Sequence, residues 1–205
     1  MFHNPIACPI DLIQEDRLYL ESEIIVNVML KQLISTEKLN AYQRLQMEHD
    51  KTYHHEIFVL DISRRMNHIA LHLAKYLYPL FSLPLSAPEN QRAFIDAFIM
   101  VASASNLLGI PLSIDLVIDD LGNTSATFIN TYIQLLAELA KGCEATDHQE
   151  DYPIRATWNK TIQKFFSLLV REASLRNISL LEEATHRLAS VEKKHPLDNI
   201  LREEE

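Results

Sequence analysis

Five polar side chains recur at helical spacing along one stretch of the chain and could do chemistry together: Asp61, Arg65, His68, His72 and Lys75. In a helix these positions share one face over about four turns. Two imidazoles four residues apart can bind one metal ion, and a carboxylate can complete such a ligand set. The stretch therefore predicts either a metal site at His68 and His72 or a helix interface where both histidines only form hydrogen bonds.

Asp96 is a second carboxylate that could join this polar stripe. It is the sole charged residue between positions 93 and 112. A carboxylate in a buried helix must be paired or protonated, so we expect its partner among the basic and imidazole groups of the stripe. The two helices would then face each other. This arrangement predicts His68, His72 and Asp96 as metal ligands, and Asp61 and Asp96 as the catalytic carboxylates.

Basic residues at both expected helices could hold an anionic ligand such as phosphate. An alternative is that they pair with neighbouring carboxylates on a solvated surface, where ion pairs contribute little to stability. The predicted ligand-binding residues are Arg64, Arg65, Lys75 and Arg92.

Other motifs in the chain are weaker. Glu183-x-x-His186 matches half of a di-iron bundle signature, but no second such pair lies in a convincing helix. His49-Asp50 lacks a plausible upstream histidine in an ordered helix, so it does not predict metal phosphohydrolase chemistry. There is no glycine-rich phosphate loop, nucleophile elbow or Cys-His signature.

Helices must position these residues, because three glycines in 205 residues leave little material for hairpins. Proline, glycine and capping residues set the expected ends. We expect Pro79 and Gly142 to end helices, Gly109 to cap one, and residues 144–151 to form a flexible loop. The helices are predicted at about 12–33, 36–49, 58–78, 89–108, 113–121, 125–141, 153–176 and 179–193.

The composition is that of a globular chain with one sizeable core, at 47% hydrophobic and 23% charged residues. We expect one all-α domain over residues 1–205. Within it we distinguish an N-terminal helical extension, a central helix pair, the remaining helices and a short tail, at residues 1–50, 56–112, 113–196 and 197–205.

Charge, cysteine content and hydropathy narrow the expected partners and compartment. A formal net charge of −9 argues against a broad nucleic-acid surface. Cys8 and Cys143 are too few for a disulfide framework, and the N-terminus lacks the pattern of a secretory signal, so we expect a cytoplasmic protein. Polar residues interrupt the apolar stretch 93–112, which favours a buried core helix over a membrane span.

The segment from the polar stripe through PENQRAFIDAFIMVASASNLLGIPL resembles the all-α nucleotide pyrophosphohydrolases of the MazG-like superfamily. The resemblance covers roughly residues 56–112. In that family the second helix reads Glu-x-x-Asp, an apolar run and a Leu-Gly-Ile ending. Asp96 matches the motif's aspartate and residues 108–110 match the ending, whereas Ala93 stands where the glutamate would be, and the first helix has no Glu-x-x-Glu.

The resemblance implies a MazG-like core of four to five helices, with extra N-terminal helices here, and a homodimer. It also implies hydrolysis of a nucleoside triphosphate with Mg²⁺ or Mn²⁺, or with a transition metal if the histidines are ligands. The chain is then a divergent pyrophosphohydrolase or a catalytically degenerate relative. The alternative is a non-enzymatic helical protein that binds a nucleotide or phosphate, or serves as an interaction protein, on the same fold.

Overall fold

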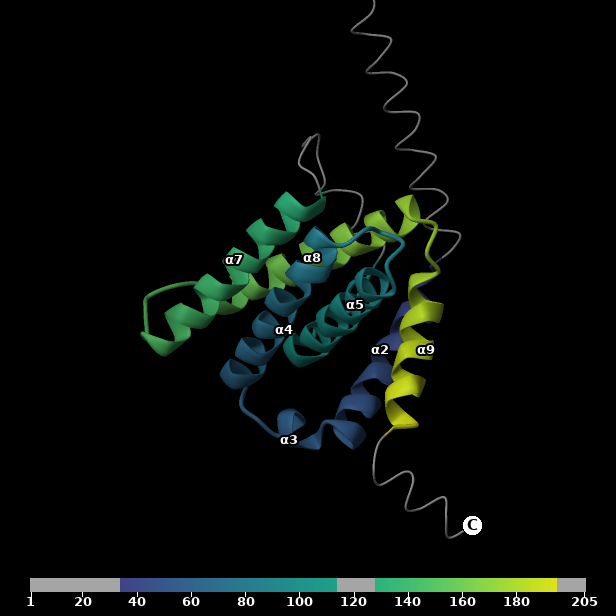
Figure 1. Ribbon diagram of the computed structural model, residues 1–205. Coiled ribbons are helices and arrows are strands. Elements are labelled where there is room, and N and C mark those ends of the chain that lie inside the picture. The colour runs from purple at the N-terminus through teal and green to yellow at the C-terminus, as the bar shows by residue number, and fades with distance from the viewer. Residues whose placement is uncertain (1–33, 114–127, 195–205) are drawn as a thin grey trace, which may run out of the picture. The chain divides into compact units, whose positions relative to one another are not determined.

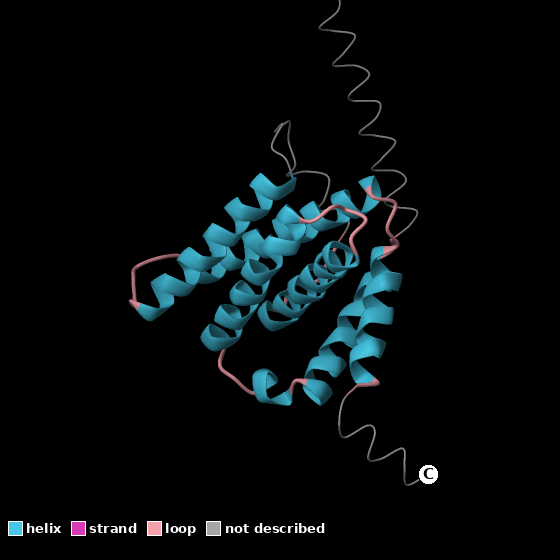
Figure 2. Cartoon of the chain, viewed as in Figure 1, coloured by secondary structure: helices cyan, strands magenta, loops and turns pink. Residues whose placement is uncertain are grey.

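A computed structural model describes residues 34–113 and 128–194 of the chain (Figure 1). Contacts divide the chain into two units, Met1–Ser35 and Thr36–Glu205, and every described helix belongs to the second. All secondary structure in the described ranges is helical, which confirms the prediction of an all-α bundle (Figure 2). The helices expected at 12–33 and 113–121 lie outside the described residues, apart from Ser113.

Helix α5, Pro88–Leu108, is the centre of the bundle and contacts α2, α4, α8 and α9 (Figure 1). Its buried side chains include Phe94, Phe98 and several alanines, whose small size lets neighbouring helices approach closely. Pro88 begins the helix and Gly109 ends it with a left-handed backbone, at φ 70°. The predicted central buried helix is confirmed, and α4, Ile62–Ser82, packs against it as expected.

The expected helix at 58–78 is wrong at both ends. The short helix α3, His55–Phe58, stops first, and α4 then starts after Asp61, whose carboxylate accepts a hydrogen bond from the Arg64 backbone nitrogen at 3.0 Å. Asp61 is thus an N-cap. At the other end α4 continues through Pro79, which we expected to end it.

The buried side chain of Asn90 caps the end of α4 beyond its proline. Its amide nitrogen donates to the carbonyl oxygens of Pro79, Leu80 and Leu83 at 3.0 to 3.3 Å. These carbonyls lie at the helix end, where no intrahelical donor is available. Arg176 holds the same side chain by donating to its amide oxygen at 3.1 Å.

Helix α7, Phe128–Asp147, and helix α8, Ile154–Leu175, pack against each other. We expected Gly142 to end a helix, but α7 runs through it. The reason is packing: a Cβ at Gly142 would overlap the indole of Trp158 on α8. The expected loop at 144–151 therefore begins only after Asp147.

Helices α2, Thr36–Tyr53, and α9, Leu180–Glu192, contact each other and α5. Residues 36–50, which we assigned to an N-terminal extension, thus belong to the packed bundle. No helix in the described ranges is long and apolar enough to cross a membrane.

Candidate functional site

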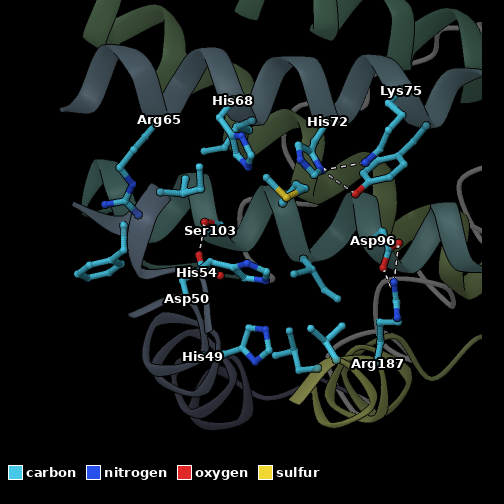
Figure 3. Close-up of a pocket in the computed structure, with 18 of the residues that line it drawn as sticks. His49, Asp50, His54, Arg65, His68, His72, Lys75, Asp96, Ser103 and Arg187 are labelled. Carbon is cyan, nitrogen blue, oxygen red and sulfur yellow. Dashed lines mark hydrogen bonds and ion pairs between the residues drawn. The ribbon is translucent and has the colours of Figure 1, made fainter. Parts of the chain in front are cut away.

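A cavity of about 400 Å³ lies among α4, α5, α9 and the end of α2 (Figure 3). This is a typical size for a small-molecule pocket. The structure brings five of the predicted site residues to its wall, and these are Arg65, His68, His72, Lys75 and Asp96. Most of the expected stripe therefore faces a cavity rather than open solvent or a closed helix interface.

The α4 wall of the cavity carries a basic residue at each end. Arg65 lies at one end, with its guanidinium 4.9 Å from the ring centre of Phe58, and Lys75 lies at the other, exposed end (Figure 3). Neither residue has an ion-pair partner among the described carboxylates. Asp50 interacts with Arg65 only beyond ion-pair distance, so both cations of this wall can still attract an anion.

His68 and His72 lie between those cations, with ring centres 4.4 Å apart. Burial, followed by the neighbouring charges of Lys75 and His68, lowers the pKa of His72 to about 4. Burial and then the nearby His54 also lower the pKa of His68. The His72 imidazole is therefore neutral at physiological pH.

The contacts of His72 define which nitrogen carries its proton. The Nδ1 atom lies 3.1 Å from the hydroxyl of Tyr76 and 3.4 Å from the ammonium of Lys75. A lysine ammonium only donates hydrogen bonds, so the contact with Lys75 favours the tautomer in which Nδ1 is the acceptor and Nε2 carries the hydrogen. In that tautomer the Nε2 hydrogen can serve an anionic ligand.

The partner of Asp96 is not on α4, as we expected, but on α9. The Asp96 carboxylate accepts hydrogen bonds from Arg187 at 2.8 and 3.3 Å (Figure 3). This two-point pair joins α5 to α9 and also raises the pKa of Arg187. The expectation failed because Arg187 lies 91 positions further along the chain.

Asp50, at the other end of the cavity, is likewise engaged. Its carboxylate accepts hydrogen bonds from Ser103 and Gln46, each at 2.6 Å. The buried His49 beside it lies 3.1 Å from the carboxylate of Glu192 on α9. The carboxylates of Asp50 and Asp96 are therefore occupied by protein donors.

A second cavity, of about 510 Å³, adjoins the first. Arg92, another predicted ligand-binding residue, lines it together with Tyr78 and Glu89. Lys75 and Asp96 line both cavities. Three of the four predicted basic residues are thus divided between two neighbouring cavities, with Lys75 at the boundary.

Asp61 and Arg64 line neither of these cavities. Their side chains pair with each other at 3.4 Å and are 58% and 72% exposed, respectively. The reason is the turn before α4, which places Asp61 at the cap instead of on the helical stripe.

The cavity does not offer the expected metal site. Within the described residues, the only group of three His, Cys, Asp or Glu side chains with ligand atoms within 4.8 Å of one another is Glu144, His148 and Glu150. The ligand atoms of His68, His72 and Asp96 are not gathered in this way. Lys75 and Arg65 would also repel a divalent cation, so these residues do not fit the Mg²⁺ or Mn²⁺ that the resemblance implies.

The group Glu144, His148 and Glu150 could hold a metal ion by its spacing, but all three residues are exposed. The ammonium of Lys141 already pairs with Glu144 at 3.0 Å and with Glu150 at 2.8 Å. Lys141 therefore already supplies the positive charge that a metal ion would bring to these two carboxylates.

Sequence reasoning missed several cavity residues. His49 and Asp50 were noticed as a dipeptide but not linked to the stripe, and Ser103 looked like one of many small residues on α5. Arg187 had no signal at all, because nothing in the local pattern of α9 connects it to Asp96.

No family model matches the chain, and no curated protein or solved structure matches it either.

Proposed function

We propose that the cavity among α4, α5 and α9 binds a phosphorylated small molecule without a metal ion. The observation that carries this proposal is the α4 wall, where Arg65 and Lys75 form no ion pair with a described carboxylate and the neutral His72 lies between them. Phosphate oxygens accept hydrogen bonds from such groups, and each charge-assisted bond is roughly twice as strong as a neutral one.

A nucleotide is the ligand that the resemblance to MazG-like proteins implies. On that interpretation the chain is a catalytically degenerate relative that retains binding. Hydrolysis of a nucleoside triphosphate remains the second candidate function, because Asp96 and His72 line the same cavity. The residues that line this cavity favour binding over hydrolysis. The carboxylate of Asp96 is paired with Arg187, and no group of three described metal-ligating side chains is assembled in the cavity.

Calorimetric titration of inorganic pyrophosphate and ADP into the protein, in buffer with EDTA, tests the proposal. We expect binding that weakens at least roughly tenfold in both Arg65→Gln and Lys75→Gln, because each variant removes a charge-assisted contact. Arg44→Gln and Lys160→Gln are matched controls, since both residues are exposed and line neither cavity. Absence of binding, or equal weakening in the controls, would contradict the proposal.

The same protein samples decide between binding and hydrolysis. Nucleoside triphosphates are supplied with Mg²⁺, Mn²⁺ or Co²⁺, and pyrophosphate release is measured. Metal-dependent release that disappears in Asp96→Asn would make hydrolysis the better description of the site.

A further inference from the structure

The walls of the cavity differ in chemistry, and this difference bears on the organic part of the ligand. The α4 wall is basic, whereas α5 contributes Ile99 and Met100 between Asp96 and Ser103. Ile99, Met100 and Ser103 follow Asp96 by three, four and seven residues, so all four side chains lie on one face of the helix. The centre of the α5 wall is therefore apolar.

Helix α9 extends the same apolar surface. Leu188 and Val191 are one turn apart and line the cavity next to Arg187. Leu188 is buried, whereas Ile99, Met100 and Val191 are half-buried and keep part of their surface available. We call these four residues the apolar floor.

Several of the polar groups that border the apolar floor are already paired. Asp96 binds Arg187, Asp50 accepts from Ser103 and Gln46, and His49 contacts Glu192. A nucleobase or a sugar on this floor would leave its own donors and acceptors without partners, which costs binding free energy. A hydrocarbon or an unsubstituted ring would instead bury apolar surface against the floor.

We propose that the ligand is a phosphate ester whose organic part is apolar, with its phosphoryl group on the α4 wall and its body on the apolar floor. This inference rests on the proposed phosphate-binding function. It differs from the nucleotide that the resemblance implies, because it assigns the body of the ligand to apolar side chains, which offer a nucleobase no hydrogen-bond partners.

The test compares three phosphate monoesters by calorimetric titration into the full-length protein with EDTA. They are 1-naphthyl phosphate, glycerol 3-phosphate and AMP, whose bodies are apolar, hydroxylated and nucleoside, respectively. We expect 1-naphthyl phosphate to bind at least roughly tenfold more tightly than the other two, because its ring buries apolar area on the floor. AMP or glycerol 3-phosphate binding as tightly as 1-naphthyl phosphate would overturn the inference.

Two floor variants locate the effect. Met100→Gln keeps an unbranched side chain of similar length but adds a polar amide, and Val191→Thr is nearly isosteric, so one can replace the other if a variant does not fold. We expect either to weaken 1-naphthyl phosphate roughly tenfold and to leave inorganic phosphate binding unchanged. Met47→Gln, on the exposed outer side of α2, is the matched control. An unchanged affinity for 1-naphthyl phosphate in a folded floor variant would refute the assignment.

The outcomes also separate the two proposals. If all three esters bind with similar affinity and depend on Lys75, the phosphate site stands and the apolar floor has no role in recognition. If none of the esters and no inorganic phosphate binds, the proposed function fails and this inference fails with it.

Discussion

His72 shows how one residue's surroundings can determine the chemistry of a site. Its Nδ1 atom lies within hydrogen-bonding distance of Tyr76 and Lys75, and its ring lies beside His68. Burial first, and then the Lys75 and His68 neighbours, favour the neutral imidazole, whereas Asp96 opposes them. A neutral imidazole between two cations donates one hydrogen bond without adding a third charge to the wall.

We expect the stability of the protein to fall as the pH decreases from about 6.5 to about 4, partly because of His72. The pKa of His72 is lowered to about 4 in the folded state, so the unfolded chain binds a proton over this range and the folded protein does not. Groups facing His72 include His68, Lys75, His54 and Asp96.

Urea unfolding at a series of pH values measures this dependence. In His72→Gln the slope of unfolding free energy against pH should become smaller between about pH 4 and 6.5. His186→Gln, at an exposed position on α9, is the control for loss of a histidine. An identical slope in His72→Gln and the original protein would contradict the expected role of His72.

At the scale of helices, two residues bear on where elements continue. Asn90 caps the end of α4 beyond Pro79, because it binds the carbonyl groups that a helix end exposes. Gly142 lets α7 continue because it leaves room for Trp158, whose indole also donates to the Leu139 carbonyl at 3.4 Å. Both residues act through contacts with another helix.

We expect Gly142→Ala to destabilise the protein by about 1 to 3 kcal/mol, the usual cost of overpacking. Alanine is the better helix former by about 1 kcal/mol, so a loss of stability would show that the contact with Trp158 outweighs helix propensity. Thermal and urea unfolding measure the change.

The matched test repeats Gly142→Ala in a Trp158→Phe background, where the smaller ring leaves space. There the penalty should shrink or reverse, since the two positions are coupled through contact. A Gly142→Ala protein as stable as the original would contradict the prediction. It would show that α7 and α8 can move apart to admit the new methyl group without a loss of stability.

At the scale of the whole molecule, a chain with a formal net charge of −9 carries a basic wall inside one cavity. The total charge lowers the affinity of the surface for polyanions, whereas the local wall can still bind a small anion. The net charge therefore argues against a polyanionic partner, but it does not predict which small molecule the cavity binds.

The homodimer implied by the resemblance is a prediction about the whole molecule. Light scattering coupled to size-exclusion chromatography should give twice the chain mass of 23.6 kDa. Measurement at two protein concentrations separates a stable dimer from a weak one. A single species at the chain mass, at both concentrations, would contradict the prediction.

The sequence by itself determined the helical class and the central helix. Few glycines and regular apolar spacing exclude most alternatives, and Pro88 and Gly109 mark the ends of α5 through their own backbone preferences. It also identified Arg65, His68, His72 and Lys75 as one stripe, because helical spacing alone places them on one face.

Only the tertiary structure decided what faces that stripe. Arg187 approaches Asp96 from 91 positions away, and His49 and Asp50 arrive on α2, so no local pattern could place them at the cavity. The turn that removes Asp61 from the stripe and the asparagine that caps α4 beyond Pro79 likewise depend on particular hydrogen bonds. Sequence periodicity indicates which face of a helix is buried or polar. A site, however, is formed by side chains from several helices, and only the packing of those helices determines which side chains come together.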